Sequence, residues 1–117
     1  MTSLRIFAVA LFFSSQAGAI TISSAVQREL LRNADIRNCY NRSQSGQDKK
    51  KGRVVLTLDV DRSGTVTAVG SDMKSSSLKE DSLHKCLIES VKNLILPLTS
   101  KARNHKNTLP LSFPPPK

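Results

Sequence analysis

The sequence predicts a small α+β domain, with a three-stranded antiparallel sheet and two helices packed on one face of it. Two patterns predict this class. Apolar residues recur at helical spacing in two segments, and they alternate with polar residues in three others, in the order α-β-β-α-β. The chain has 117 residues, which is the usual length of one domain.

Residues 1–19 have the arrangement of a secretory signal peptide. Arg5 precedes an apolar run over residues 6–13, and Ala17 and Ala19 supply the small residues that a signal peptidase recognises. The apolar run is too short to cross a bilayer. We therefore expect cleavage after Ala19 and a single mature domain over residues 20–117. We expect that domain to be periplasmic or secreted, without a transmembrane anchor.

The first predicted helix covers residues 24–40. Val26, Leu30 and Ala34 recur at a spacing of four, and a serine at position 23 or 24 can cap the start. Residues 41–52 contain only polar residues and glycine, so we expect a polar, mobile loop.

Residues 53–69 predict an antiparallel hairpin. Two strands, 53–60 and 65–69, flank the turn sequence of residues 61–64. The first strand alternates apolar and other residues, so one of its faces needs cover from a helix. That face carries Val54, Leu56, Leu58 and Val60.

The second predicted helix begins near Ser77, which forms a capping-box pattern with Glu80, and the helical region ends at Pro97. A basic loop over residues 101–107 follows. A short strand over residues 109–113 then closes the domain before three prolines. The helix has an apolar stripe at helical spacing, which consists of Leu83, Cys86, Leu87, Val91 and Leu94.

Two cysteines, Cys39 and Cys86, occur in the chain. An even number in an exported protein favours a disulfide over two buried free thiols or a metal site. A metal site needs more ligands, and the only histidines are His84 and His105. A bridge that closes so long a loop stabilises the fold by at most about 4 kcal/mol. It would tie the two helices together over the sheet.

Catalytic and cofactor motifs are not recognisable in the sequence, so we expect neither an enzyme nor a bound cofactor. Residues 59–64 resemble the start of a calcium loop, but Gly70 stands where the bidentate carboxylate is required. His84 is expected on the helix surface, within reach of Glu80. Asp81 is expected to interact favourably with the helix dipole.

The formal net charge of the chain is +9, and removal of Arg5 with the signal leaves +8. Such a charge attracts anionic surfaces. The only aromatic residues after the signal, Tyr40 and Phe113, are expected in the core rather than stacked on bases, which argues against specific nucleic-acid binding. The predicted basic patch combines two groups, namely Lys49, Lys50, Lys51 and Arg53, and Lys101, Arg103 and Lys106.

Several segments match one known pattern together, namely Cys39-Tyr40, residues 52–58, Gly64-Thr65-Val66, the stripe Leu83, Cys86, Leu87 and Val91, then Pro97 and residues 109–113. With these segments, the chain over residues 24–114 resembles the TonB C-terminal-like fold, and especially its two-cysteine AgmX/PglI form. The chain departs from the usual family pattern before Pro97, where Ile95-Leu96 replaces an aromatic residue. The resemblance implies a fold and a binding mode, with the last strand as an exposed edge.

We therefore expect a binding module that adds an extended peptide of an envelope protein to its sheet. Pro110 removes one donor from the last strand, so the other edge, near residues 65–69, is the alternative. A second hypothesis is a cationic protein that binds an anionic envelope polymer or membrane surface through its basic loops. The sequence gives no oligomeric state. The predicted partner-binding edge consists of Thr108, Leu109, Leu111, Ser112 and Phe113.

Overall fold

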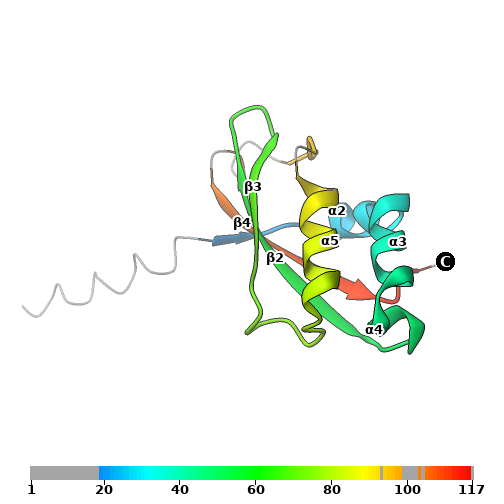
Figure 1. The fold of residues 1–117 in the computed structure, drawn as a ribbon. Helices are drawn as coiled ribbons and strands as arrows, with labels where there is room; N and C mark the ends of the chain where they lie inside the picture. Colours follow the sequence, from blue (N-terminus) through cyan, green and yellow to red (C-terminus); the bar gives the residue numbers. More distant parts are fainter. Residues whose placement is uncertain (1–18, 93, 99–102, 104, 117) are drawn as a thin grey trace, which may run out of the picture.

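The computed structural model describes residues 19–92, 94–98, 103 and 105–116. Helices α2, α3 and α5 gather on one side of a sheet, which confirms the α+β class (Figure 1). The elements in chain order are β1 (Ala19–Thr21), α2 (Ser24–Leu31), α3 (Ala34–Arg42), α4 (Gln44–Gln47), β2 (Gly52–Val60), β3 (Val66–Ser71), α5 (Asp81–Val91) and β4 (Lys106–Phe113).

The sheet has four strands in the order β1-β4-β2-β3, and β1 runs parallel to β4. The prediction of three antiparallel strands is therefore wrong. The additional strand is only three residues long and begins at Ala19, where the signal pattern ends. It is held by its pairing with Lys106–Thr108 and by the Ile22 N–H, which donates to the Thr108 carbonyl at 2.9 Å. A segment so short has no alternation from which to predict a strand.

The β2–β3 hairpin is antiparallel, as predicted, with a bulge between Asp59 and Val60. The turn uses the polar residues that the sequence offers. Asp61 Oδ1 accepts from the backbone N–H groups of Ser63 and Thr65 at 2.9 and 3.0 Å. Gly64 has a φ of 91°, a conformation that disfavours other residues.

The core lies between the helices and one sheet face. The β2 residues predicted to need cover, at positions 54, 56, 58 and 60, are all buried. The register places Leu109 opposite Leu56 and Leu111 opposite Val54, so β4 extends the same apolar face. Tyr40 stacks on Phe113 with ring centroids 5.0 Å apart, which joins α3 to the end of β4.

The opposite face of the sheet carries mostly polar or small residues, together with the buried Val55 of β2. Thr21, Thr108, Thr57 and Gly70 are aligned across the four strands. Helices α2, α3 and α5 all lie on the other side (Figure 1). The three threonines need no apolar cover, whereas the backbone of Val55 is bonded to Asp72 and Ser76 of the segment that follows β3.

The predicted first helix is divided in two. Asn33 Oδ1 accepts from the N–H groups of Asp35 and Ile36, so Asn33 caps a new helix. Part of the predicted loop is also helical, since Ser43 caps the short helix α4 by accepting from the Gly46 N–H. The spacing-four pattern hid the break, because it included Ala34, which is exposed, whereas α3 buries Ile36, Cys39 and Tyr40.

The second helix begins later than predicted, and the capping box is wrong. Ser77 Oγ accepts from the Arg53 N–H of β2 at 2.8 Å, and Glu80 occupies the N-cap without a side-chain capping bond. The helix ends at Val91, so Leu94 lies outside it. The final strand begins at Lys106, earlier than predicted.

Candidate binding surfaces

The outer edge of β3 is the longer open backbone edge of the sheet. The Asp72 N–H donates to the Val55 carbonyl, and Thr57 lies opposite Gly70 in the register. Backbone groups alternate between the two sides of a strand. Gly70 therefore faces β2, while Val69 and Ser71 direct their N–H and C=O groups away from the sheet. Within the described part of the chain, no backbone hydrogen bond joins these groups to another segment.

A short segment covers only the beginning of this edge. The Val66 N–H donates to the Leu94 carbonyl at 2.8 Å, and the Leu96 N–H donates to the Gly64 carbonyl at 2.9 Å. Ile95 between them is 72% exposed. The open part of the edge therefore starts after Val66, beside a large exposed apolar side chain.

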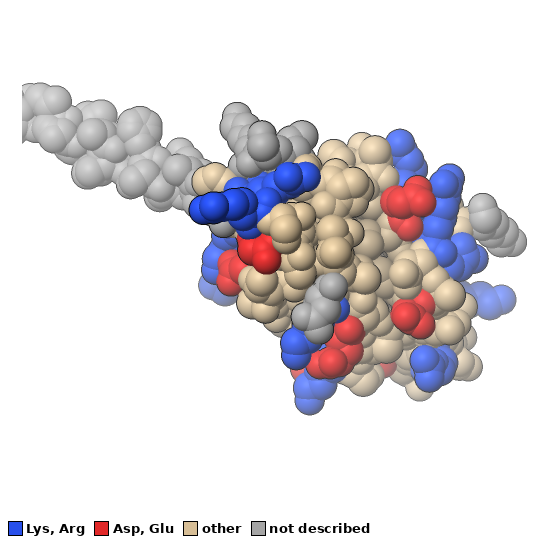
Figure 2. All heavy atoms as spheres, turned by 90° about the horizontal axis from the view of Figure 1, so that it is seen from above, with Lys and Arg blue, Asp and Glu red and all other residues tan. Residues whose placement is uncertain are grey.

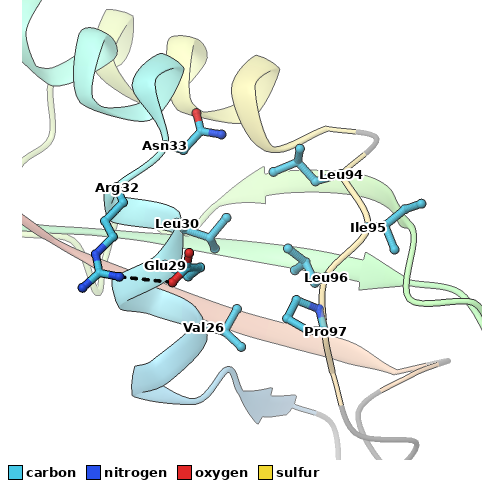
Figure 3. A pocket seen from close by; sticks show the side chains of 9 residues that line it. All are labelled: Val26, Glu29, Leu30, Arg32, Asn33, Leu94, Ile95, Leu96 and Pro97. Atoms are coloured by element: carbon cyan, nitrogen blue, oxygen red, sulfur yellow. Dashed lines mark hydrogen bonds and ion pairs between the residues drawn. The ribbon is translucent and has the colours of Figure 1, made fainter.

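A groove separates this segment from α2 (Figure 3). Val26 and Leu30 of α2 face Leu96 and Pro97 across it, whereas Ile95 points away. Its volume is about 340 Å³. The groove is also lined by Asn33 and Leu94, and by Arg32 and Glu29, which form an ion pair with a nitrogen–oxygen distance of 3.5 Å.

Helix α5 lies along the inner side of β3. His84 Nδ1 is 2.9 Å from Ser71 Oγ, and the residues after the helix meet Val66, so α5 runs antiparallel to β3. Ile88 is one helical turn, about 5.4 Å, beyond His84. Val69 precedes Ser71 by about 6.6 Å of strand. Ile88 is thus level with Val69, and both are partly buried at the margin of the core.

His84 is 1% exposed, so the prediction of a surface position is wrong. Its Nε2 lies 2.7 Å from the Leu78 carbonyl, which can only accept, so Nε2 carries a proton. His84 lies on the same helix face as Leu87 and Val91, at spacings of three and seven. This spacing indicated a buried position for His84. The prediction of a surface position followed instead from the expected pair with Glu80.

Glu80 binds the start of α4 rather than His84. Oε1 accepts from the Ser45 N–H at 2.8 Å and from the Ser45 hydroxyl at 2.9 Å, and Oε2 accepts from the Gln44 N–H at 3.1 Å. The Ser82 hydroxyl donates to Oε2 at 2.7 Å. The Ser82 hydroxyl and these α4 groups lower the pKa of Glu80 to about 2, against the opposing effect of burial. Sequence reasoning missed this contact, because its partners are more than thirty positions apart.

The predicted edge on β4 is less open than expected. β4 lies between β1 and β2, and Thr108 is paired with Thr21. The Thr108 carbonyl faces β1, so alternation directs Pro110 and Ser112 to the same side. Leu109, Leu111 and Phe113 bond toward β2, with side chains in the core. Pro110 carries no N–H, so Ser112 offers the single donor beyond β1.

The two predicted basic groups lie at opposite ends of the sheet. Gly52 pairs with Phe113, and Asp59 pairs with Lys106. Arg53 and Lys106 are therefore about 20 Å apart along β2. Lys106 Nζ is 3.9 Å from Asp59 Oδ1, and Lys101 is outside the described residues. On the face shown in Figure 2, Asp and Glu side chains lie among the Lys and Arg side chains, and the separation along β2 means that these groups do not form one patch.

A disulfide joins Cys39 of α3 to Cys86 of α5, as predicted, with 5.6 Å between the Cα atoms. Cys39 is 3% exposed, and Cys86 is partly buried. The described residues contain no group of three or more His, Cys, Asp or Glu placed to hold a metal. Among the helices in the described ranges, none is long and apolar enough to cross a membrane.

Comparisons with known protein families, with curated proteins and with solved structures found no match. The resemblance to the TonB C-terminal-like fold therefore stays a prediction from the sequence.

Proposed function

We propose that the mature protein is an exported binding module that recognises an extended segment of an envelope protein. The partner segment pairs with the outer edge of β3 and lengthens the sheet by one strand. The observation that carries the proposal is the set of outward backbone groups at Val69 and Ser71. The disulfide supports export, because such bonds persist in oxidising compartments.

The β3 edge fits a partner strand better than β4 does. Val69 and Ser71 supply two donors and two acceptors on one line. The part of the β4 edge that β1 leaves unpaired supplies two acceptors, the carbonyls of Pro110 and Ser112, and one donor, the N–H of Ser112. Each net hydrogen bond contributes about 1 kcal/mol, so a missing donor weakens a short strand pairing appreciably.

Side chains beside the β3 edge can make the pairing specific for particular partner sequences. On the helix side, Val69 and Ile88 present apolar surface at the margin of the core. On the opposite side, Gly70 and the exposed Ala68 leave room for a larger neighbour. A partner with alternating apolar and polar residues therefore places its apolar side chains against Val69 and Ile88.

A pair of proline variants tests the proposal. Val69→Pro removes an N–H that faces away from the sheet, so the fold should tolerate it, whereas peptide binding should be lost. Ser112→Pro makes the same change on the outward side of β4 and should leave binding intact. The probe is a peptide selected on the wild-type domain from a library of extended sequences. Equal losses in both variants, or none in Val69→Pro, would exclude pairing at β3.

Salt separates this proposal from the polymer hypothesis. Exposed charges are screened over about 8 Å at physiological ionic strength, so binding through the basic loops should weaken steeply as salt is added. Strand pairing should weaken much less. The separation of the two basic groups supports the peptide partner over the polymer.

A further inference from the structure

The disulfide borders a surface hollow of about 220 Å³. The end of α3 lines one side with Cys39 and Arg42, and α5 lines the other with Ser82 and Cys86. The two cysteines differ in access, since Cys39 is 3% exposed and Cys86 is only partly buried. A thiolate that enters this hollow therefore reaches the Cys86 sulfur more readily than the Cys39 sulfur.

The surroundings also distinguish the two sulfurs chemically. The Ser90 hydroxyl donates to the Cys86 carbonyl at 3.0 Å, and its oxygen lies 3.3 Å from Cys39 Sγ. A disulfide sulfur has no proton to donate, and the one Ser90 hydroxyl proton is donated to the Cys86 carbonyl while the disulfide is closed. When the disulfide opens, the same hydroxyl can turn about its Cβ–Oγ bond and donate to the Cys39 thiolate 3.3 Å away, which makes Cys39 the better leaving group.

We propose that Cys86 is a thiol–disulfide exchange site for an exported protein dithiol. A thiolate of the dithiol attacks Cys86 Sγ, the S–S bond breaks, and its electron pair leaves on Cys39 Sγ. The second thiolate of the partner then attacks the other partner sulfur, which is bonded to Cys86 Sγ in the mixed disulfide. This step releases Cys86 as a thiolate. The partner dithiol is oxidised to a disulfide, and the two cysteines take up two protons. The Arg42 guanidinium beside the hollow attracts the incoming anion.

Opening the bond releases α3 from α5 without dissolving the fold. Glu80 still holds the start of α4, and Tyr40 still stacks on Phe113. The Tyr40 hydroxyl also donates to the Lys50 carbonyl at 2.6 Å. The product is a folded dithiol with a looser pair of helices, which the partner can close again by the reverse steps.

The test uses the folded mature protein and reduced glutathione as the probe thiol. After an acid quench, mass spectrometry locates the mixed disulfide. Hydrogen exchange of core amides, under conditions where every opening leads to exchange, gives the rate of global unfolding. We expect the adduct predominantly on Cys86, formed faster than the protein unfolds. An adduct mainly on Cys39, or reduction only at the rate of unfolding, would overturn the proposal.

Two serine variants test the leaving group. Ser90→Ala should slow exchange roughly three- to ten-fold through loss of one hydrogen bond. Ser82→Ala borders the same hollow, but its hydroxyl donates to Glu80, so its exchange rate should match the wild type. Equal rates in all three proteins would exclude Ser90 from the reaction. The position of the adduct on the wild-type chain decides the site even if a variant folds poorly.

Discussion

The helix pair α3–α5 and the β2–β3 hairpin are stabilised in different ways. The helix pair depends on partners far apart in the chain, namely the bridge between Cys39 and Cys86 and the Glu80 contact with α4. The hairpin depends on neighbours, with Asp61 closing a turn between two strands that follow each other directly. Local contacts cost little loop entropy, whereas distant ones require the whole core. The hairpin should therefore outlast the helix pair when the protein is weakened.

Removing the disulfide should have the largest effect. The bridged positions are 47 residues apart, which corresponds to at most about 4 kcal/mol of stabilisation. The double variant Cys39→Ala/Cys86→Ala should lower Tm by about 15 °C or more. Hydrogen exchange should rise first in α2 and α3 and later in the hairpin. A uniform rise across the chain would mean that the domain unfolds as one unit and would refute the order.

Replacing His84 should have the next largest effect. His84→Ala removes a buried ring and leaves the Leu78 carbonyl without its donor, for a loss of about 3 kcal/mol. Lys85→Ala changes an exposed neighbour and should alter stability by less than about 0.5 kcal/mol. Thermal unfolding of both variants gives the comparison. If both variants lower the free energy of unfolding by the same amount, the described packing of His84 is wrong.

The Glu80 contact should make the helix pair sensitive to acid. The pKa of Glu80 falls from 4.5 to about 2 on folding. The carboxylate therefore stabilises the fold fully above pH 4.5, and this stabilisation is lost as the pH falls toward 2. Glu80→Gln should cost about 1 kcal/mol at neutral pH, as for other helix caps.

Denaturant unfolding of wild type and Glu80→Gln across this pH range measures the effect. The difference between them should shrink as the pH falls. A difference that stays constant down to pH 2 would show that the charge of Glu80 is not what holds α4.

The smallest effect should come from the hairpin turn. Asp61→Ala removes the acceptor of the Ser63 and Thr65 N–H groups, which are exposed enough to bond with water instead. Faster hydrogen exchange should be confined to residues near the turn, with the helices unchanged. Arg62→Ala, in the same turn without these bonds, is the matched control. Faster exchange in α3 or α5 of the Asp61 variant would show that the two regions are coupled.

The difference between local and distant contacts also explains which features could be predicted from the sequence. The hairpin, the buried face of β2 and the cysteine pairing followed from alternation, turn residues and the cysteine count. The break at Asn33, the burial of His84 and the Glu80 contact did not, since each depends on which distant groups meet. β1 was missed because three residues show no period, and its presence removed β4 from the margin of the sheet. The β3 edge was predicted only as an alternative.

Backbone protection in a peptide complex tests the central claim most directly. Amide hydrogen exchange of the domain over residues 20–117 would be measured with and without the selected peptide. Pairing at β3 predicts slower exchange at Val69 and Ser71, whose N–H groups face away from the sheet, and little change at Ser112 on β4. Unchanged exchange at Val69 and Ser71 in the saturated complex, with protection in the lysine-rich segment of residues 49–51 instead, would contradict strand addition.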